Sequence, residues 1–206
     1  RTAREGMRMS EPSVEILPPF HRGASLENAR HVLINLHGRG GNQKQAANYA
    51  MRLAARDVAV LAPGSTTDGP WWPYRHSEPV AKDDPYLVAG LHAVEAAVQQ
   101  ALDAGFAPSE IVLSGFSMGA ALAREHVART GRPYRAVIAM TGALLGTLGP
   151  GPEMLPEGEP DRYTADLTGI PIVVTTHDWD LQVPAPFVAA TVNILRARGA
   201  KVTAHV

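Results

Sequence analysis

The segment Ile111–Leu122, with the sequence IVLSGFSMGAAL, decides the fold class of this chain. Its first three residues form an apolar, β-branched run that predicts a buried strand, and its end opens a helical pattern. Gly115 and Gly119 flank Ser117 and lack Cβ atoms, so that neighbouring backbone can approach a sharp turn between strand and helix. A serine on such a turn is typical of a catalytic nucleophile. The alternative is an ordinary connection that contains an incidental serine.

Short apolar runs alternate with longer helical patterns along the rest of the chain. Because the runs are apolar throughout, we expect strands buried on both faces of a mostly parallel sheet, flanked by helices in an α/β fold of one domain, residues 1–206. Residues 1–12 are expected to be flexible, and Gly146–Pro160 to be a loop, either near a ligand site or simply a connector. The other predicted strands are Val32–Leu36, Val58–Leu61, Ala136–Met140, Ile170–Thr175 and Lys201–Val206, and the predicted helices are Gln45–Ala55, Asp84 to about Gly105, Ser117–Thr130 and Pro186–Arg198.

The composition narrows the class of function. A net charge of −1, from 19 basic and 20 acidic residues, gives no indication of a nucleic-acid partner or of stable membrane association. The absence of cysteine excludes disulfides, thiolate metal sites and cysteine nucleophiles. We expect no cofactor and no metal, a cytoplasmic location and a small-molecule partner, and a homodimer is left open.

A second glycine-rich turn, His37–Gly41, directly follows the predicted strand that ends at Leu36. Acyl transfer needs backbone N–H groups that point at the developing oxyanion. In enzymes with this kind of serine turn, one such N–H belongs to the residue after the nucleophile, here Met118, and another to an earlier loop, here Arg39 or Gly40. The alternative for His37–Gly41 is a tight turn without a catalytic role.

Two carboxylates follow the predicted strand Ile170–Thr175, namely Asp178 and Asp180. A carboxylate at this end of a late strand orients the histidine of a catalytic triad and stabilises its charged form. The alternative is a loop carboxylate that caps the next helix. His177 beside them suggests a metal site only weakly, because one histidine and two aspartates in one loop are poor evidence for it.

Together these segments resemble the phospholipase/carboxylesterase family of α/β-hydrolases, which includes acyl-protein thioesterases and small bacterial esterases. The resemblance implies the α/β-hydrolase fold with Ser117 as nucleophile. The family pattern Asp-x-x-Val-Pro favours Asp180 over Asp178. An aromatic residue near the acyl site is another family feature, so Trp71 and Trp72 are candidate substrate-binding residues, with core packing as the equal alternative. The matching segments are His37–Gly41, Asp103–Phe106 with Pro108 and Ile111, Gly115–Ala120, and Asp180–Pro184.

The general base is the point at which this sequence departs from the family pattern. In this fold the catalytic residues occur along the chain in the order Ser, Asp, His. In the printed sequence, His205 is the one histidine after Asp180. The resemblance implies a stretch like Tyr-x-Gly-x-x-His directly after Val206, so we expect the catalytic histidine there, with His205 as the less favoured substitute. His37 is expected to shape the oxyanion loop and to lie near the substrate. We expect His21, His31, His76, His92 and His126 to be surface or packed residues.

The sequence therefore predicts a carboxylesterase that cleaves small esters through an acyl-enzyme on Ser117. No amphipathic lid is evident, which favours short acyl chains. The first alternative is an acyl-thioesterase or lysophospholipase that acts on long chains. The second is a binding protein that kept the hydrolase scaffold without catalysis.

Overall fold

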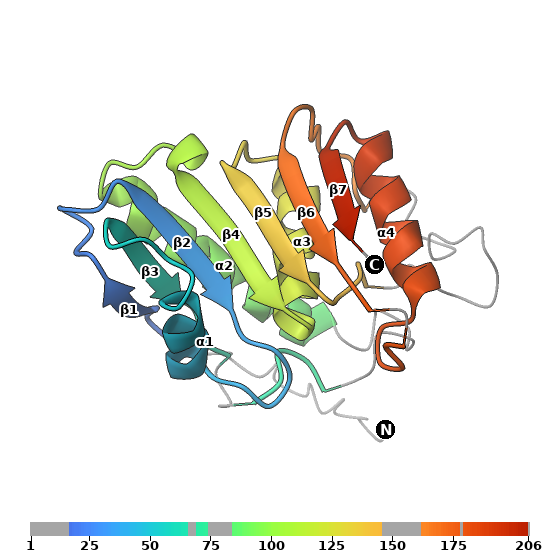
Figure 1. Cartoon of the computed structure of the whole chain (residues 1–206), viewed down its shortest axis with the longest axis horizontal. Helices are drawn as coiled ribbons and strands as arrows, with labels where there is room; N and C mark the ends of the chain where they lie inside the picture. Colours follow the sequence, from blue (N-terminus) through green and yellow to red (C-terminus); the bar gives the residue numbers. More distant parts are fainter. Residues whose placement is uncertain (1–16, 66–68, 74–83, 146–161, 178, 206) are drawn as a thin grey trace, which may run out of the picture.

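The computed structural model describes residues 17–65, 69–73, 84–145, 162–177 and 179–205. Within them lies a seven-stranded sheet with the order β1-β3-β2-β4-β5-β6-β7 (Figure 1). All neighbouring strands pair in parallel except β1 and β3, which are antiparallel. Residues 1–12 and Gly146–Pro160 lie outside the described part, so the expectations for them are untested.

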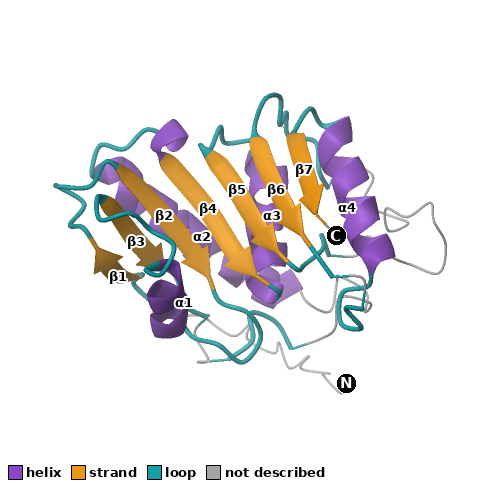
Figure 2. Ribbon diagram, in the orientation of Figure 1, coloured by secondary structure: helices purple, strands orange, loops and turns teal. Residues whose placement is uncertain are grey.

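Figure 2 shows how strands and helices alternate along the described chain. The strands are β1 Phe20–Gly23, β2 His31–Leu36, β3 Val58–Ala62, β4 Ile111–Phe116, β5 Ala136–Met140, β6 Pro171–Thr175 and β7 Lys201–His205. The helices are α1 Gln43–Ala50, α2 Asp84–Asp103, α3 Met118–Thr130 and α4 Ala185–Ala197, and a short 3₁₀ helix, η2, spans Pro108–Glu110.

Most predicted elements are present, and the differences have physical reasons. The sequence did not predict β1, which is a short, mostly exposed edge strand of the sequence FHRG without apolar alternation. Helix α1 begins directly after Asn42, whose side-chain oxygen caps the helix by accepting the Gln45 N–H at 3.0 Å. It ends at Ala50 rather than Ala55, because Met51, Arg52 and Leu53 are exposed to solvent and only Ala54 still packs on the cluster beneath the helix.

The two faces of the sheet are covered unequally in the described part. One face packs against α2, α3 and α4 in a single large core that includes Val137, Ile172 and Leu122. Helix α1 covers the other face near β3 through a smaller cluster. Toward the other edge of this face, Ile138 and Val173 are only half-buried. Strands β5 and β6 are therefore less buried on this face than on the other, although the expected parallel sheet with helices on both faces is present.

The parallel strands bring their carboxyl ends to one edge of the sheet (Figure 1). The loops after β2, β4, β5 and β6 all leave at this edge, where open α/β sheets bind their ligands. Register pairs Leu36 with Gly115 and Phe116 with Met140, so the glycine-rich turn after β2 and the serine turn after β4 are neighbours.

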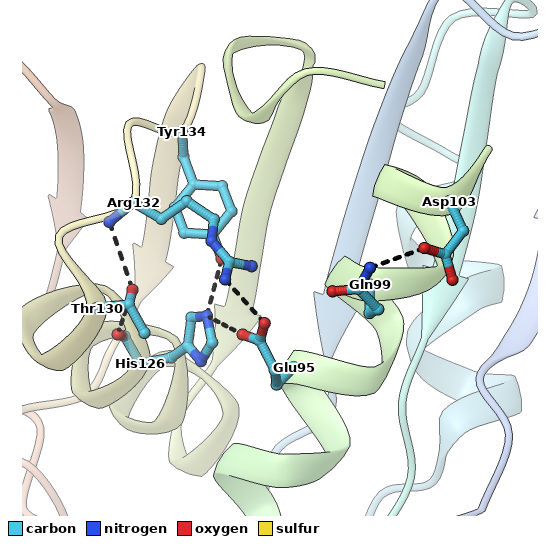
Figure 3. Close-up of polar contacts among 7 residues, drawn as sticks. All are labelled: Glu95, Gln99, Asp103, His126, Thr130, Arg132 and Tyr134. Atoms are coloured by element: carbon cyan, nitrogen blue, oxygen red, sulfur yellow. Dashed lines mark hydrogen bonds and ion pairs between the residues drawn. The ribbon is translucent and has the colours of Figure 1, made fainter. Parts of the chain in front are cut away.

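A polar network joins α2 to α3 near the other end of α3 (Figure 3). His126 is 2% exposed, and its Nε2 lies 2.8 Å from the Tyr134 hydroxyl and 3.5 Å from Glu95 Oε2. Arg132 donates to the other Glu95 oxygen at 2.8 Å. Burial lowers the pKa of His126 from 6.5 to about 4. The Arg132 charge acts in the same direction, and the opposing effect of the Glu95 charge is smaller than that of burial.

Because of this shift, the free energy of unfolding should decrease as the pH is lowered. Between pH 6.5 and 4 the unfolded chain binds a proton on residue 126 that the folded chain does not, so acidification favours unfolding. From pH 7.5 to pH 5, the wild type should lose about 2 kcal/mol more of its free energy of unfolding than His126→Gln. Urea denaturation at both pH values measures this, with His92→Gln, at an exposed position of α2, as the matched control. Equal losses in the wild type and His126→Gln would contradict a neutral buried histidine.

Candidate active site

Ser117 occupies a strained turn between β4 and α3. Its φ of 53° and ψ of −117° lie where residues with a side chain are rarely found. The turn is held by two backbone hydrogen bonds, from Ser117 N–H to the Met140 carbonyl at 2.9 Å and from Ala121 N–H to the Ser117 carbonyl at 3.0 Å. A strained serine at the N-terminus of a helix is the geometry of an activated nucleophile, because the hydroxyl projects from the end of the sheet.

The two glycines of the turn are required by close backbone packing. A Cβ on Gly119 would lie 2.4 Å from the Leu36 carbonyl oxygen and 2.6 Å from that of His37. A Cβ on Gly115 would lie 2.4 Å from the backbone of Gly119. The sequence prediction of a turn that needs glycine on both sides of Ser117 is confirmed by these distances.

The loop after β2 lies directly against the serine. Gly41 N–H donates to the Gly38 carbonyl at 3.1 Å, and Gly40 has a φ of +74°, so residues 38–41 form a tight turn that needs glycine at its third position. A Cβ on Gly38 would lie 3.3 Å from the Ser117 Cβ. Arg39 lines the same cleft as Ser117 and Met118. Of the predicted oxyanion residues, Met118 and Arg39 thus lie at the cleft with the serine, whereas Gly40 lines a neighbouring pocket.

His37 and Trp71 support this loop from behind. Their rings stack with centroids 4.6 Å apart, and Trp71 Nε1 donates to the His37 carbonyl at 2.9 Å. His37 Nδ1 lies 2.9 Å from the Gly38 carbonyl. Both side chains are buried. They hold the backbone of the loop, and the expected contact of either side chain with substrate stays a prediction.

A cleft of about 640 Å³ opens at Ser117. Trp72, the other candidate substrate-binding tryptophan, lines it together with apolar residues from the loops after β5 and β6. A smaller pocket of about 400 Å³ lies on the far side of the oxyanion loop and includes His37 and Phe116 in its lining. The cleft is lined by Arg39, Trp72, Pro73, Ser117, Met118, Ala121, Gly142, Ala143, Leu145, Leu181, Gln182, Val183, Pro184 and Phe187.

Asp180 is half-buried in the loop between β6 and α4. Its Oδ1 accepts the N–H groups of Gln182 at 2.8 Å and Val183 at 2.9 Å. Both donors also line the cleft, so the carboxylate is fixed at its margin. Among the described residues no hydrogen-bond donor is found for Oδ2. Asp178, the competing carboxylate, lies outside the described part.

No histidine of the described residues lines the Ser117 cleft. His205 ends β7, which is three strands from β4 in the sheet, about 14 Å at the usual strand spacing. Its side chain is exposed, and its carbonyl accepts Thr176 N–H at 2.9 Å. His126 is packed and His21 and His92 are exposed, as expected, whereas His76 lies outside the described part. The histidine expected after Val206 stays a prediction.

Sequence reasoning missed two buried charges on α3, Arg124 and Glu125, both 0% exposed. Arg124 donates to the carbonyls of Ala139, at 3.0 Å, and of Gly142, and burial lowers its pKa to about 9. These contacts fix the loop after β5 behind Ser117. The only signal in the sequence is the run Arg-Glu-His within an otherwise apolar, alanine-rich helix, where a solvent-exposed face is the more usual interpretation.

The described residues contain no group of three or more His, Asp or Glu side chains that could hold a metal ion. Among the helices they form, none has the length and apolar character needed to cross a membrane.

Comparisons with known proteins agree with this geometry. The sequence model of the phospholipase/carboxylesterase family matches residues 24–206. Acyl-protein thioesterase 1 of Saccharomyces cerevisiae is 30% identical over 118 residues, 48% of this chain and 52% of that protein, so the match spans about half of this relative's length. A crystal structure of a phospholipase/carboxylesterase from Dyadobacter fermentans is 30% identical, with a TM-score of 0.81 over 94% of this chain and 87% of that one. A carboxylesterase from Mesorhizobium loti, at 22% identity and a TM-score of 0.65 over 86% of this chain and 79% of that one, shares the fold.

The packing of the serine turn predicts a large effect of one methyl group. Gly119→Ala would drive a Cβ into the Leu36 carbonyl, so we expect it to lower the free energy of unfolding by about 2 kcal/mol or more. Gly64→Ala is the matched control, since a Cβ on this equally buried glycine meets only the movable end of the Gln43 side chain, at 3.1 Å. Urea denaturation of both variants measures the difference. If Gly119→Ala were as stable as Gly64→Ala, the close approach would be disproved.

Proposed function

Because the chain belongs to the phospholipase/carboxylesterase family of α/β-hydrolases, we propose that it hydrolyses carboxylic esters through an acyl-enzyme on Ser117. One observation carries the proposal. The strained Ser117 lines a cleft of about 640 Å³, and the turn of residues 38–41 approaches the serine so closely that a Cβ on Gly38 would lie 3.3 Å from the Ser117 Cβ.

In the first half of the proposed reaction, Ser117 Oγ attacks the ester carbonyl carbon while its proton passes to a histidine. The carbonyl oxygen becomes an oxyanion and accepts the N–H groups of Met118 and of Arg39 or Gly40. The N–H of Met118 suits this role because the first N–H groups of a helix have no acceptor within the helix. Loss of one such donor typically costs about 2.7–4 kcal/mol of transition-state stabilisation. The alcohol leaves with the proton from the histidine, and water then hydrolyses the acyl-enzyme.

Asp180 is proposed to orient the catalytic histidine. Two backbone N–H groups hold its Oδ1, so the carboxylate keeps one orientation and can accept a ring N–H through its other oxygen. We keep the prediction that this histidine follows Val206, with His205 as the alternative. The distance of about 14 Å across three strands argues against His205.

The substrates are proposed to be small esters with short acyl chains. Most of the residues that line the cleft have apolar side chains, and Arg39 is the one charged side chain in its described lining. The similarity to an acyl-protein thioesterase favours the alternative of a long-chain thioester substrate. A cytoplasmic location, the absence of nucleic-acid and stable membrane partners, and a homodimer stay predictions.

Active-site labelling tests the proposed catalytic residues. A fluorophosphonate probe should label the intact natural protein and should not label Ser117→Ala. Asp180→Asn should lower kcat/KM for p-nitrophenyl acetate by about 100-fold or more, because the histidine loses its orienting carboxylate. Asp178→Asn is the matched control and should stay within about threefold of the wild type.

The same experiment separates the alternatives. An intact protein that the probe does not label would support a non-catalytic binding protein. A larger loss in Asp178→Asn than in Asp180→Asn would exchange the roles of the two carboxylates.

A series of p-nitrophenyl esters from acetate to palmitate tests the substrate class. We expect kcat/KM to be highest for the short chains, because the sequence contains no obvious amphipathic lid segment and the cleft of about 640 Å³ is of a size typical for small ligands. Faster turnover of the long chains would establish the long-chain alternative instead.

A further inference from the structure

The segment of residues 139–145, which comprises the last two residues of β5 and the loop after it and is here called the cleft-wall loop, forms one wall of the Ser117 cleft. Three of its residues, Gly142, Ala143 and Leu145, line the cleft. A Cβ on Gly142 would lie 2.7 Å from the Ser117 carbonyl oxygen, so the loop is packed against the nucleophile itself. The position of this loop therefore sets the space beside Ser117.

Side chains from two helices hold the cleft-wall loop. Arg124 of α3 donates to the carbonyls of Ala139 and Gly142 at its start. Thr191 of α4 accepts Leu144 N–H at 3.0 Å, and Glu125 of α3 accepts Leu145 N–H at 2.7 Å at its end. The loop is thus fixed at both ends by buried polar groups, and Leu145 depends directly on the Glu125 carboxylate.

The Glu125 carboxylate is fully buried and has three donors. Besides Leu145 N–H, its Oε1 accepts the Tyr163 hydroxyl at 2.5 Å, and its Oε2 accepts Arg129 Nε at 3.0 Å. Tyr163 also lies 3.3 Å from the Leu145 carbonyl. Burial and the neighbouring Glu125 charge raise the pKa of Tyr163, so its hydroxyl keeps the proton that it donates. The Tyr163 hydroxyl thus supports Leu145 twice, through the carboxylate that accepts its N–H and through its carbonyl, and loss of the hydroxyl removes both supports.

We propose that Glu125 and Tyr163 are positioning residues for acyl-chain selectivity, which hold Leu145 in place so that the cleft-wall loop limits the length of the acyl group at Ser117. The proposal rests on the ester hydrolysis proposed above. It assigns a function to a buried glutamate–tyrosine pair, neither member of which lines the cleft. Loss of the Tyr163 hydroxyl should loosen Leu145 and widen the cleft for longer chains.

Tyr134 provides a matched control, because its hydroxyl also contacts a side chain of α3. Both tyrosines are buried, and each hydroxyl is bonded to an α3 side chain, Tyr163 to Glu125 and Tyr134 to His126 at 2.8 Å. The two contacts serve different parts of the structure. Tyr134 belongs to the polar network between α2 and α3 (Figure 3), whereas Tyr163 contacts Leu145 in the cleft-wall loop. Tyr163→Phe and Tyr134→Phe therefore remove the same group with similar loss of buried hydrogen bonding.

The measured quantity is the ratio of kcat/KM for p-nitrophenyl octanoate to that for the butyrate ester, which does not depend on the fraction of folded protein. Tyr163→Phe should raise this ratio by about threefold or more, and Tyr134→Phe should leave it within about twofold of the wild type. Amide hydrogen exchange adds a readout without substrate. The Leu145 N–H should exchange at least about threefold faster in Tyr163→Phe than in Tyr134→Phe.

An unchanged or lowered ratio in Tyr163→Phe, or an equal rise in Tyr134→Phe, overturns the inference while ester hydrolysis by the wild type leaves the proposed function intact. A wild-type protein that hydrolyses neither ester overturns the proposed function and, with it, the role in selectivity.

Discussion

Where α3 begins, backbone packs directly on backbone, and Gly119 lies so near the end of β2 that a Cβ would be 2.4 Å from one carbonyl oxygen and 2.6 Å from the next. Because the contact is between main-chain atoms, it leaves little freedom for the loop that follows β2. The second carbonyl, that of His37, also accepts the Trp71 indole N–H, and the His37 ring stacks on Trp71. The loop of residues 37–41, the proposed oxyanion loop, therefore takes its position from the serine turn and not from its own sequence alone. Hydrogen-bond donors fixed before substrate arrives are the kind that stabilise a transition state at little reorganisation cost.

The strain at Ser117 is compatible with this packing because the surrounding structure holds the residue from both sides. A non-glycine residue at positive φ costs on the order of 1–3 kcal/mol. The Ser117 N–H donates to the Met140 carbonyl, and the Ser117 carbonyl accepts the Ala121 N–H. The next loop repeats the device, since Thr141 also has a φ of 53° and its N–H donates to the Thr175 carbonyl at 2.8 Å. The ends of β4, β5 and β6 are thereby joined at the edge of the sheet where Ser117 and Asp180 lie.

The sequence predicts those parts of the site that local patterns encode. The serine turn and the loop of residues 38–41 were predictable, because each needs glycine at fixed positions next to an apolar strand. Strand β1 was not, since its pairing with β3 gives stability that no alternation in FHRG reveals. The supporting role of Trp71 depends on a contact 34 residues away in the chain. Arg124 and Glu125 were missed for the same reason, because most of the groups bonded to them, other than Arg129, lie on distant segments.

Helix α3 carries buried charged side chains close to Ser117, which is unusual. The partners toward which these side chains point explain why the charges are tolerated. A buried ion pair seldom adds net stability over apolar packing, but it does penalise any arrangement that leaves a charge unpaired. Arg124 and Glu125 bind the backbone of the cleft-wall loop, whereas His126, the next residue, turns to α2 and binds Tyr134. A rotation of α3 about its axis would break these contacts together. Since Ser117 is the residue before the first turn of this helix, the same constraint that fixes α3 also fixes the direction in which the serine points.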